Sequence, residues 1–338
     1  MKKIILILVI LLTTGCYDYV ELNNISIVSS IGIDYIDNEF ILTLEILDDN
    51  NSSYVVSTKG KTIVNAFDNA SVIVNKIPYY YHLKALIISE EIAYNHLNEI
   101  TDYFIRNPKI IHSFYLVMCK DITAKEFLNT KNIQVIGDEI ENKMDNKVYE
   151  YSISYTDYFE DVMERLLNKR KDAMMTTFII NNNSIETYGI ALFKDNKLLD
   201  ILDKEESSLL NILLSNSTNM TLENDDLIIN IYDNKTDISF DNKIIINVSS
   251  EAQIVTNKNN NNLKKDESYL KFNDDFSKLL MGKLDSLINK LNNLNIDPLS
   301  IRWKYYQQYK KDLNDLDIKL IVNLKVNKKG LIFEANYE

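Results

Sequence analysis

Glycine, proline, cysteine and histidine are all scarce in this chain of 338 residues, which has seven Gly, three Pro, two Cys and three His. Nucleotide-binding loops need closely spaced glycines that let the backbone approach phosphate, and neither a P-loop nor a Gly-x-Gly-x-x-Gly motif occurs. The Gly-x-Ser-x-Gly and His-Glu-x-x-His signatures of hydrolases and zinc peptidases are missing too. We therefore expect no enzymatic activity, no catalytic residues and no cofactor.

The three histidines do not form a compact metal motif. His82, His96 and His112 are separated by 14 and 16 residues, counted from their positions. Zinc-binding motifs place at least some of their ligands two to about five residues apart. We expect no metal site.

Cys16 and Cys119 have different predicted roles. Cys119 ends the apolar run 114–119, which is typical of a small buried core residue. If Cys16 is acylated, Cys119 is the only free thiol, so no intramolecular disulfide can form. Stability then has to come from packed cores.

Positive charge is in short supply. The chain has 37 basic and 49 acidic residues, a formal charge of −12, and loss of Lys2 and Lys3 with a signal peptide leaves 35 basic residues and −14. Such a surface repels phosphate, so we expect no nucleic-acid partner. It also repels anionic lipid, which assigns membrane anchoring to a covalent lipid rather than to a basic patch.

The N-terminus has the pattern of an export signal. Lys2 and Lys3 precede nine apolar residues, 4–12, and Thr13-Thr14-Gly15-Cys16 follows. Nine residues in a helix reach only about half of a ~30 Å hydrocarbon core. Small residues before a cysteine are what a bacterial lipoprotein signal peptidase recognises. We expect residues 1–15 to be a lipoprotein signal peptide and Cys16 to carry the lipid that attaches the mature chain to the outer face of the cell membrane.

Alternating and helical patterns predict a mixed α/β chain. In the N-terminal part we expect strands at 25–36, 40–47, 53–58, 83–89, 110–119, 174–180, 185–193 and 197–202, and helices at 62–74, 90–104 and 156–169, with a short one opened by a Thr123-x-x-Glu126 capping box. Residues 129–147, rich in Asn, Asp and Lys, are predicted to be loosely ordered.

In the C-terminal part we expect helices near 207–214, at 273–293 and around Trp303, and strands at 226–232, 243–256 and 317–326.

The fold class predicted from these patterns is α+β, with two to three mixed α/β domains, each a sheet packed with helices, behind the signal peptide. About 323 mature residues exceed what one core usually serves. The predicted divisions are an N-terminal α/β domain at 16–120, a middle α/β region at 121–203, and a C-terminal α+β domain at 204–338.

Two aromatic clusters are candidate contact surfaces. One is Tyr79-Tyr80-Tyr81 after Pro78, and the other is Trp303-Lys304-Tyr305-Tyr306. Aromatic residues presented from loops are common at interfaces, although packing explains most of the 21 tyrosines of this chain. We take Tyr79, Tyr80 and Tyr81 as a possible interface.

Several short motifs, in order, resemble one family. They are Gly15-Cys16-Tyr17-Asp18 with Glu21-Leu22-Asn23, Ile31-Gly32-Ile33-Asp34, Gly60-Lys61-Thr62, Asn69-Ala70-Ser71, His82-Leu83-Lys84 with Glu90-Glu91, Arg106-Asn107-Pro108, Gly189-Ile190-Ala191-Leu192-Phe193-Lys194, Asp297-Pro298-Leu299 with Trp303, and Lys329-Gly330. Together they resemble the Ger(x)C lipoproteins, the C subunits of spore nutrient germinant receptors. Tyr17, where the family usually has Trp, and Thr13 depart from its pattern.

The resemblance implies a palmitate-type lipid anchor, a location on the spore inner membrane, and A and B membrane subunits as partners in triggering germination. It supplies no ligand site and no catalytic residue. Two other readings remain open: a lipid-anchored solute-binding protein of a nutrient transporter, and a lipid-anchored enzyme. The low glycine count argues against the first, and the missing motifs argue against the second.

Overall fold

The computed structural model describes residues 21–328 except for 49, 51, 146–152, 156–157, 217–218, 260–265 and 314–316. The elements in chain order are η1 (Leu22–Asn24), β1 (Ile25–Ile36), β2 (Glu39–Leu47), β3 (Ser53–Gly60), α2 (Ile63–Ile73), β4 (Ile77–Tyr79), β5 (Ala85–Ser89), η2 (Ile92–His96), α3 (Leu97–Arg106), β6 (Tyr115–Cys119), α4 (Ala124–Leu128), α5 (Ile136–Asp145), α6 (Phe159–Leu167), β7 (Ala173–Asn181), β8 (Ser184–Lys194), β9 (Lys197–Leu202), α7 (Lys204–Leu213), β10 (Met220–Glu223), β11 (Leu227–Phe240), β12 (Ile244–Asn257), α8 (Asp266–Asn293), α9 (Ile301–Tyr309) and β13 (Ile318–Lys328).

The first sheet has the strand order β3-β2-β1-β5-β6-β7-β8-β9, with the short β4 pairing beside the start of β1. Its middle strands β1, β5, β6 and β7 are parallel, and antiparallel hairpins flank them on both sides. Asp37 and Asn38 both have positive φ in the β1–β2 turn, which is the backbone that a tight two-residue hairpin requires. The predicted hairpin is therefore confirmed.

Helices cover both faces of this sheet. One face packs in a core with α2, α3 and α6, built around Phe67, Phe104 and Phe159. The other face packs against α4 and α5 through residues that include Phe127 and Ile140. All residues of β5 and β6 are buried, as expected for parallel strands covered on both faces.

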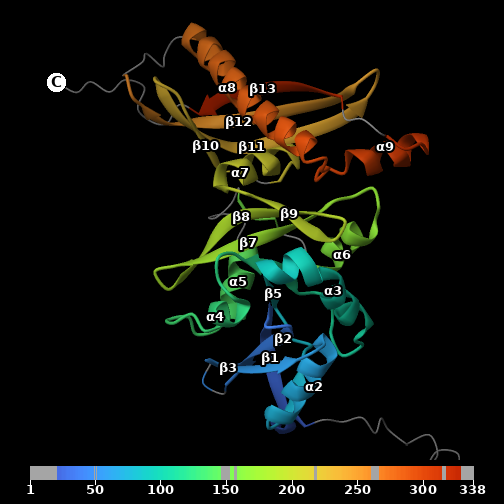
Figure 1. Ribbon diagram of the computed structural model, residues 1–338. Helices are drawn as coiled ribbons and strands as arrows, with labels where there is room; N and C mark the ends of the chain where they lie inside the picture. The colour runs from blue at the N-terminus through green and yellow to red at the C-terminus, as the bar shows by residue number, and fades with distance from the viewer. Residues whose placement is uncertain are drawn as a thin grey trace, which may run out of the picture.

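The second sheet has the order β10-β11-β12-β13, antiparallel except for the parallel β12–β13 pair. Helices α7 and α8 pack on one face of it, and α7 lies between the two sheets (Figure 1). Leu192 and Leu202 from the first sheet share one core with Leu210 of α7 and Leu280 of α8. The two sheets are thus joined by apolar packing.

The predicted fold class is confirmed: two sheets, each packed with helices, make up the described chain. The ranges 16–120 and 121–203 share one sheet, because β6 pairs with β7 across the expected division. The C-terminal range 204–338 contains the whole second sheet. The predicted signal peptide, 1–15, lies outside the described residues.

Several local predictions differ from the structure. The range 129–147 contains the helix α5, whereas loose order was expected. Strand β6 begins at Tyr115 rather than at 110, and β11 continues to Phe240 instead of ending at 232. In the second half of β11 partly buried residues alternate with exposed ones, and this half pairs with β12. The polar composition of residues 233–240 gave no strand signal in the sequence.

Candidate functional site

Cys16, the predicted lipidation site, lies outside the described residues. The description begins at Glu21, four residues before β1. No helix within the described ranges is both long and apolar enough to cross a bilayer. The structure leaves the lipid anchor as a prediction from sequence.

The three candidate interface tyrosines occupy three different environments around β4. Tyr80 is buried, with 7% of its surface exposed, and packs edge-on against Phe67 in the core. Burial raises the pKa of the Tyr80 phenol. Tyr79 is half-buried and stacks on Tyr81 at 5.0 Å between ring centroids, and Tyr81 is half-exposed. Only Tyr79 and Tyr81 are therefore available to a partner.

A groove with a volume of about 1180 Å³ runs beside these tyrosines. The start of β1, the last turn of α2, the α2–β4 loop, β4 and Lys109 of the α3–β6 loop form its walls. Within the part of the chain that the structure describes, its lining contains two lysines, Lys76 and Lys109, and neither an aspartate nor a glutamate. In so acidic a chain this basic and apolar surface stands out.

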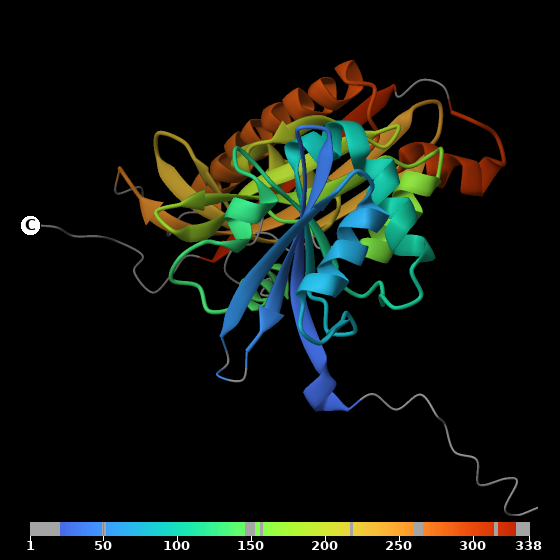
Figure 2. The ribbon, with the colours of Figure 1, turned by 60° about the horizontal axis from the view of Figure 1, so that its bottom comes forward.

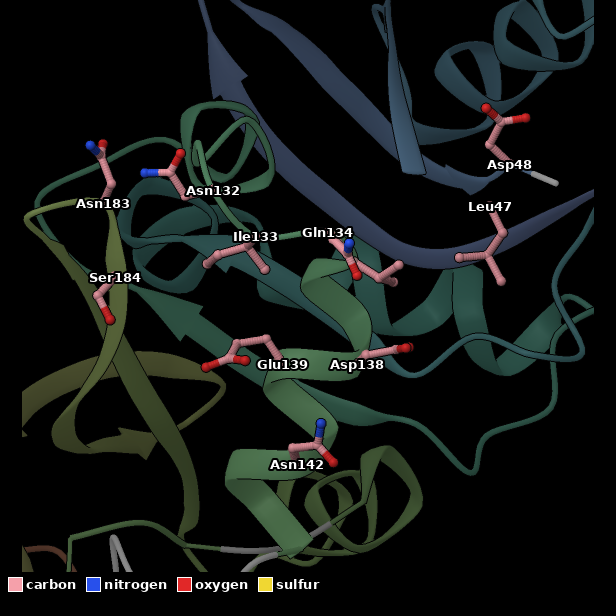
Figure 3. A pocket seen from close by; sticks show the side chains of 11 residues that line it. Leu47, Asp48, Asn132, Ile133, Gln134, Asp138, Glu139, Asn142, Asn183 and Ser184 are labelled. Carbon is pink, nitrogen blue, oxygen red and sulfur yellow. The ribbon is translucent and has the colours of Figure 1, made fainter. Parts of the chain in front are cut away.

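A second, polar groove of about 840 Å³ lies between the end of β2, α5 and the β7–β8 turn (Figure 3). Carboxyl and amide groups dominate its walls, among them Asp48, Asn132, Asp138 and Glu139. Asp138 is engaged by Lys84 at 2.9 Å, and Glu139 by Lys143 at 3.4 Å. The charges of Asp138 and Glu139 are thus neutralised by lysines of the protein itself.

The carboxylate of Glu45 links β1, β3 and the start of α5 beside this groove. It is fully buried and accepts hydrogen bonds from Ser30 Oγ at 2.5 Å and from Ser53 Oγ at 2.8 Å. The backbone N–H groups of Ile136 and Gly137 donate to it at 2.6 and 3.0 Å. Glu45 on β2 thus closes the N-terminus of α5, where the positive end of the helix dipole favours an anion.

Asp34 and Asp297 play the same part for two other helices. Asp34, at the end of β1, accepts from the N–H groups of Ala124 and Lys125 at 2.7 and 2.9 Å. Asp297 accepts from those of Ile301 and Arg302 at 2.9 and 2.7 Å. Burial raises the pKa of both carboxyls above the ordinary range. These acids are structural caps.

The three histidines lie in separate surroundings. His96 Nδ1 pairs with Glu99 at 2.9 Å, His112 Nε2 lies 2.9 Å from the Phe104 carbonyl, and His82 lies against Tyr79. Across the part of the chain that the structure describes, no group of three or more His, Cys, Asp or Glu residues is arranged to hold a metal ion.

Cys119 is a buried core residue, as its apolar run predicted. It is fully buried, and its Sγ lies 3.3 Å from the Ile122 carbonyl oxygen. Burial raises the pKa of the Cys119 thiol well above its ordinary value. A neutral thiol of this kind is a poor nucleophile.

The C-terminal aromatic cluster joins the two sheets instead of lining a ligand pocket. Arg170, from the α6–β7 loop, stacks 3.8 Å from the Tyr306 ring centre and pairs with Asp312 at 2.7 Å. Lys171 lies 5.4 Å from the Trp303 ring centre. These contacts hold α9 against the first sheet's unit, alongside the shared core around α7.

Chemically, the two grooves of the described surface offer polar, basic and apolar side chains for binding. Glu45, Asp34 and Asp297 serve as helix caps, and Asp138, Glu139 and Arg170 form ion pairs. The features that sequence reasoning missed are the lysine-lined groove and the buried caps. Asp34 and Asp297 were noticed only as parts of family motifs, while Glu45 gave no local signal because its partners lie about ninety residues away.

Comparisons with known proteins agree along the whole chain. A model of the spore germination protein N-terminal domain matches residues 18–180, and a model described as spore germination B3/GerAC-like, C-terminal, matches 188–330. The Bacillus subtilis (strain 168) protein YfkR is 18% identical over 99% of this chain and 98% of its own length. Spore germination protein KC of the same organism is 29% identical over 27% of this chain and 26% of its own.

Spore germination protein B3 of Bacillus subtilis (strain 168) is 27% identical over 37% of this chain and 36% of its own length. Among solved structures, the GerBC protein superposes with a TM-score of 0.56 at 14% identity, covering 88% of this chain and 96% of that one. At this identity the superposition speaks for a shared fold.

Proposed function

This chain belongs to the Ger(x)C family of spore germination proteins, and from this membership we propose that it is the lipid-anchored, non-catalytic C subunit of a nutrient germinant receptor. It acts with membrane A and B subunits to trigger germination, from the outer face of the spore inner membrane. The observation that carries the proposal is the pair of family domains, which cover the described chain in order and begin two residues after Cys16.

The way the two sheets are joined also favours a receptor subunit over a solute-binding protein. A two-lobed binding protein holds its ligand in a cleft between lobes that resemble each other. Here the two sheets have different topologies, and α7 lies in a core shared by both. Apolar packing fills the place where a ligand cleft would open.

The direct test of the receptor role is genetic. Spores that lack this chain should fail to respond to at least one nutrient, yet should still germinate with a non-nutrient trigger. The acylated chain extracted from spore membranes in mild detergent should co-purify with two multi-spanning proteins. Normal responses to every nutrient, or a chain recovered alone, would count against the proposal.

The two cysteines provide a matched test of the anchor. Cys16→Ala should abolish incorporation of a labelled fatty acid and release the chain from the membrane fraction, whereas Cys119→Ala should retain the label because its thiol is buried. Two acyl chains hold a protein stably on a bilayer, since each buried CH₂ contributes about 0.8 kcal/mol. An unmodified Cys16 in the mass spectrum of the membrane-bound chain would refute this part.

Of the three tyrosines proposed as an interface, Tyr80 belongs to the core, and Tyr79 and Tyr81 are accessible to a partner. We therefore propose Tyr79 and Tyr81 as the contact residues. Both lie beside the start of β1, the described segment closest along the chain to Cys16.

A further inference from the structure

The N-terminal unit ends in an exposed apolar surface. Val72 is 84% exposed, Ile73 55%, Ile77 56% and Tyr81 50%, and we call these four residues the tip surface. Ile77 and Tyr81 line the groove together with Tyr79, and Val72 and Ile73 lie between Ser71 and Val74, which line it as well. This is the end of the molecule where β1 begins and α2 ends (Figures 1 and 2). Exposed apolar side chains that gather at one end of a protein mark a candidate contact site.

The groove beside the tip surface carries positive charge in a chain that is acidic as a whole. Among the described residues, its charged lining is Lys76 and Lys109 with no acidic side chain, although the sequence carries 49 acidic and 37 basic residues. Lysines beside exposed apolar and aromatic residues form the combination that binds the headgroup region of an anionic bilayer. The net charge predicts repulsion from such a bilayer, but the local charge favours attraction.

The covalent path from Cys16 allows the tip surface to reach the membrane. Five peptide units separate Cys16 from Glu21, and a chain spans at most about 3.6 Å per residue, or roughly 18 Å in all. Ile25, four residues further on, pairs in register with Ile77. Neighbouring strands lie about 4.8 Å apart, so an anchor on Cys16 keeps Ile77 within roughly 37 Å of the lipid and allows it to reach the lipid surface.

We propose that the tip surface seats on the anionic phospholipid bilayer that carries the acylated Cys16. Ile77, Val72 and Ile73 enter the headgroup boundary, Tyr79 and Tyr81 lie at its level, and Lys76 and Lys109 contact lipid phosphates. The molecule then stands with the start of β1 toward the lipid and the second sheet away from it (Figure 1). This inference rests on the proposed anchor and assigns lipid, not the A or B subunit, to the face with Tyr79 and Tyr81.

The test uses the full acylated chain reconstituted in vesicles of phosphatidylcholine and phosphatidylglycerol, without other proteins. A polarity-sensitive fluorophore is attached to Ile77→Cys or, as a matched control on β12, to Val255→Cys, because the two native side chains are 56% and 59% exposed. Native Cys119 is buried and escapes labelling. Lipids with nitroxide-bearing acyl chains then report contact with the bilayer.

We expect the fluorophore at Ile77→Cys to be quenched at least about twofold, since an apolar surface enters a bilayer by some 5–10 Å, and the one at Val255→Cys to be unaffected. Val72→Cys, the most exposed position, should behave like Ile77→Cys and guards against a folding defect in one variant. Combined Lys76→Ala and Lys109→Ala should lower the seated-to-unseated ratio by roughly tenfold or more. Lys235→Ala with Lys319→Ala, on the second sheet, should leave it unchanged.

Flotation of the vesicles distinguishes failure of the lipid anchor from failure of the tip surface to seat on lipid. If the chain fails to float with the vesicles, the lipid anchor is refuted. If it floats but the fluorophores at Ile77→Cys and Val72→Cys stay unquenched, the seating on lipid is refuted. The seating is also refuted if energy transfer shows that the fluorophores of two copies lie close together, because the tip surface then contacts a second copy of the chain. Equal quenching in pure phosphatidylcholine would refute the part assigned to anionic headgroups.

Discussion

At the scale of single residues, buried carboxylates on the strands and loops support the helices. Glu45, Asp34 and Asp297 are at most 2% exposed, and each accepts two backbone N–H bonds at the start of a helix that it does not belong to. A buried charge is costly unless it is hydrogen-bonded, and here the helix N-terminus provides both donors and a favourable dipole. The acids of the Gly-Ile-Asp and Asp-Pro-Leu motifs thus stabilise the fold.

The raised pKa of Asp34 predicts a pH effect on stability. Desolvation raises its pKa in the folded chain above the ordinary 3.8, so between these two values the folded state binds more protons than the unfolded state. The free energy of unfolding from this group therefore falls as pH rises through that interval. Asp34→Asn should flatten the pH dependence and lose one N–H bond, about 1–2 kcal/mol.

Urea unfolding of the chain from Tyr17 onward, followed between about pH 4 and pH 7, measures this difference. Comparing wild type with Asp34→Asn cancels the contributions of the other carboxyls, including Asp172 and Asp297, whose pKa values are also raised by burial. Parallel stability curves for the two proteins would show that Asp34 does not titrate as inferred.

Neighbouring tyrosines should respond differently to truncation. Tyr80→Ala removes a core ring that packs on Phe67 and should lower the free energy of unfolding by about 3 kcal/mol or more. Tyr81→Ala, at the half-exposed neighbour, should change it by less than about 1 kcal/mol. Thermal melts of the two variants measure this, and equal losses would contradict the placement of Tyr80 in the core.

At the scale of elements, the sequence predicts those that local signals define. Asp37 and Asn38 mark the β1–β2 turn, Thr62 caps α2, and Thr123 with Glu126 forms the predicted capping box of α4. Helix α5 was not predicted, because the residue that caps it is Glu45, on the distant strand β2. A helix stabilised by a distant residue is hidden in a segment rich in Asn, Asp and Lys.

The helix predicted for 90–104 shows a second limit of local patterns. It is interrupted by the π-helical turn η2, Ile92–His96, before α3 continues. The His96 ring stacks on Tyr35 of β1 at 3.9 Å between ring centres. The contact between His96 and Tyr35 joins residues far apart in the sequence, so the apolar periodicity of the helix cannot predict it.

Two glycines in different elements should give opposite results when replaced by alanine. In β8 a Cβ on Gly189 would lie 2.0 Å from the Leu202 backbone oxygen, where β9 and α7 crowd it, so Gly189→Ala should destabilise strongly. Gly282 is exposed within α8 and has open space, so Gly282→Ala should stabilise by about 0.5–1 kcal/mol. The denaturant midpoints of the two variants measure these changes. A Gly189→Ala variant as stable as the wild type would contradict the close approach of Gly189 to the Leu202 backbone.

At the scale of the whole molecule, domains cannot be counted from composition because the two units are interlocked. The first sheet continues from β6 to β7 through the pairing of Met118 with Thr177, a contact between distant parts of the chain. The two family domains meet between 180 and 188, inside the β7–β8 hairpin. A sequence boundary therefore falls within a sheet, and β8 and β9 serve both units.

This interlocking predicts that the two sheets unfold together. Leu210 of α7 is fully buried in the core that joins Leu192 of β8 to Ile229 of β11 and Leu280 of α8. Leu210→Ala should lower the free energy of unfolding by about 2–5 kcal/mol through the cavity it leaves. Both units should lose stability equally, because neither can retain its half of the shared core alone.

Two reporters follow the units separately. Trp303, the single tryptophan, reports on α9 by fluorescence, and hydrogen exchange of β5 reports on the first sheet. The control is Ile88→Ala, a cavity in the core of the first sheet alone. In one cooperative unit, either substitution shifts both reporters to the same urea midpoint. If Ile88→Ala moves only the β5 transition and leaves that of Trp303 in place, the units unfold independently, and the shared core around Leu210 does not couple them.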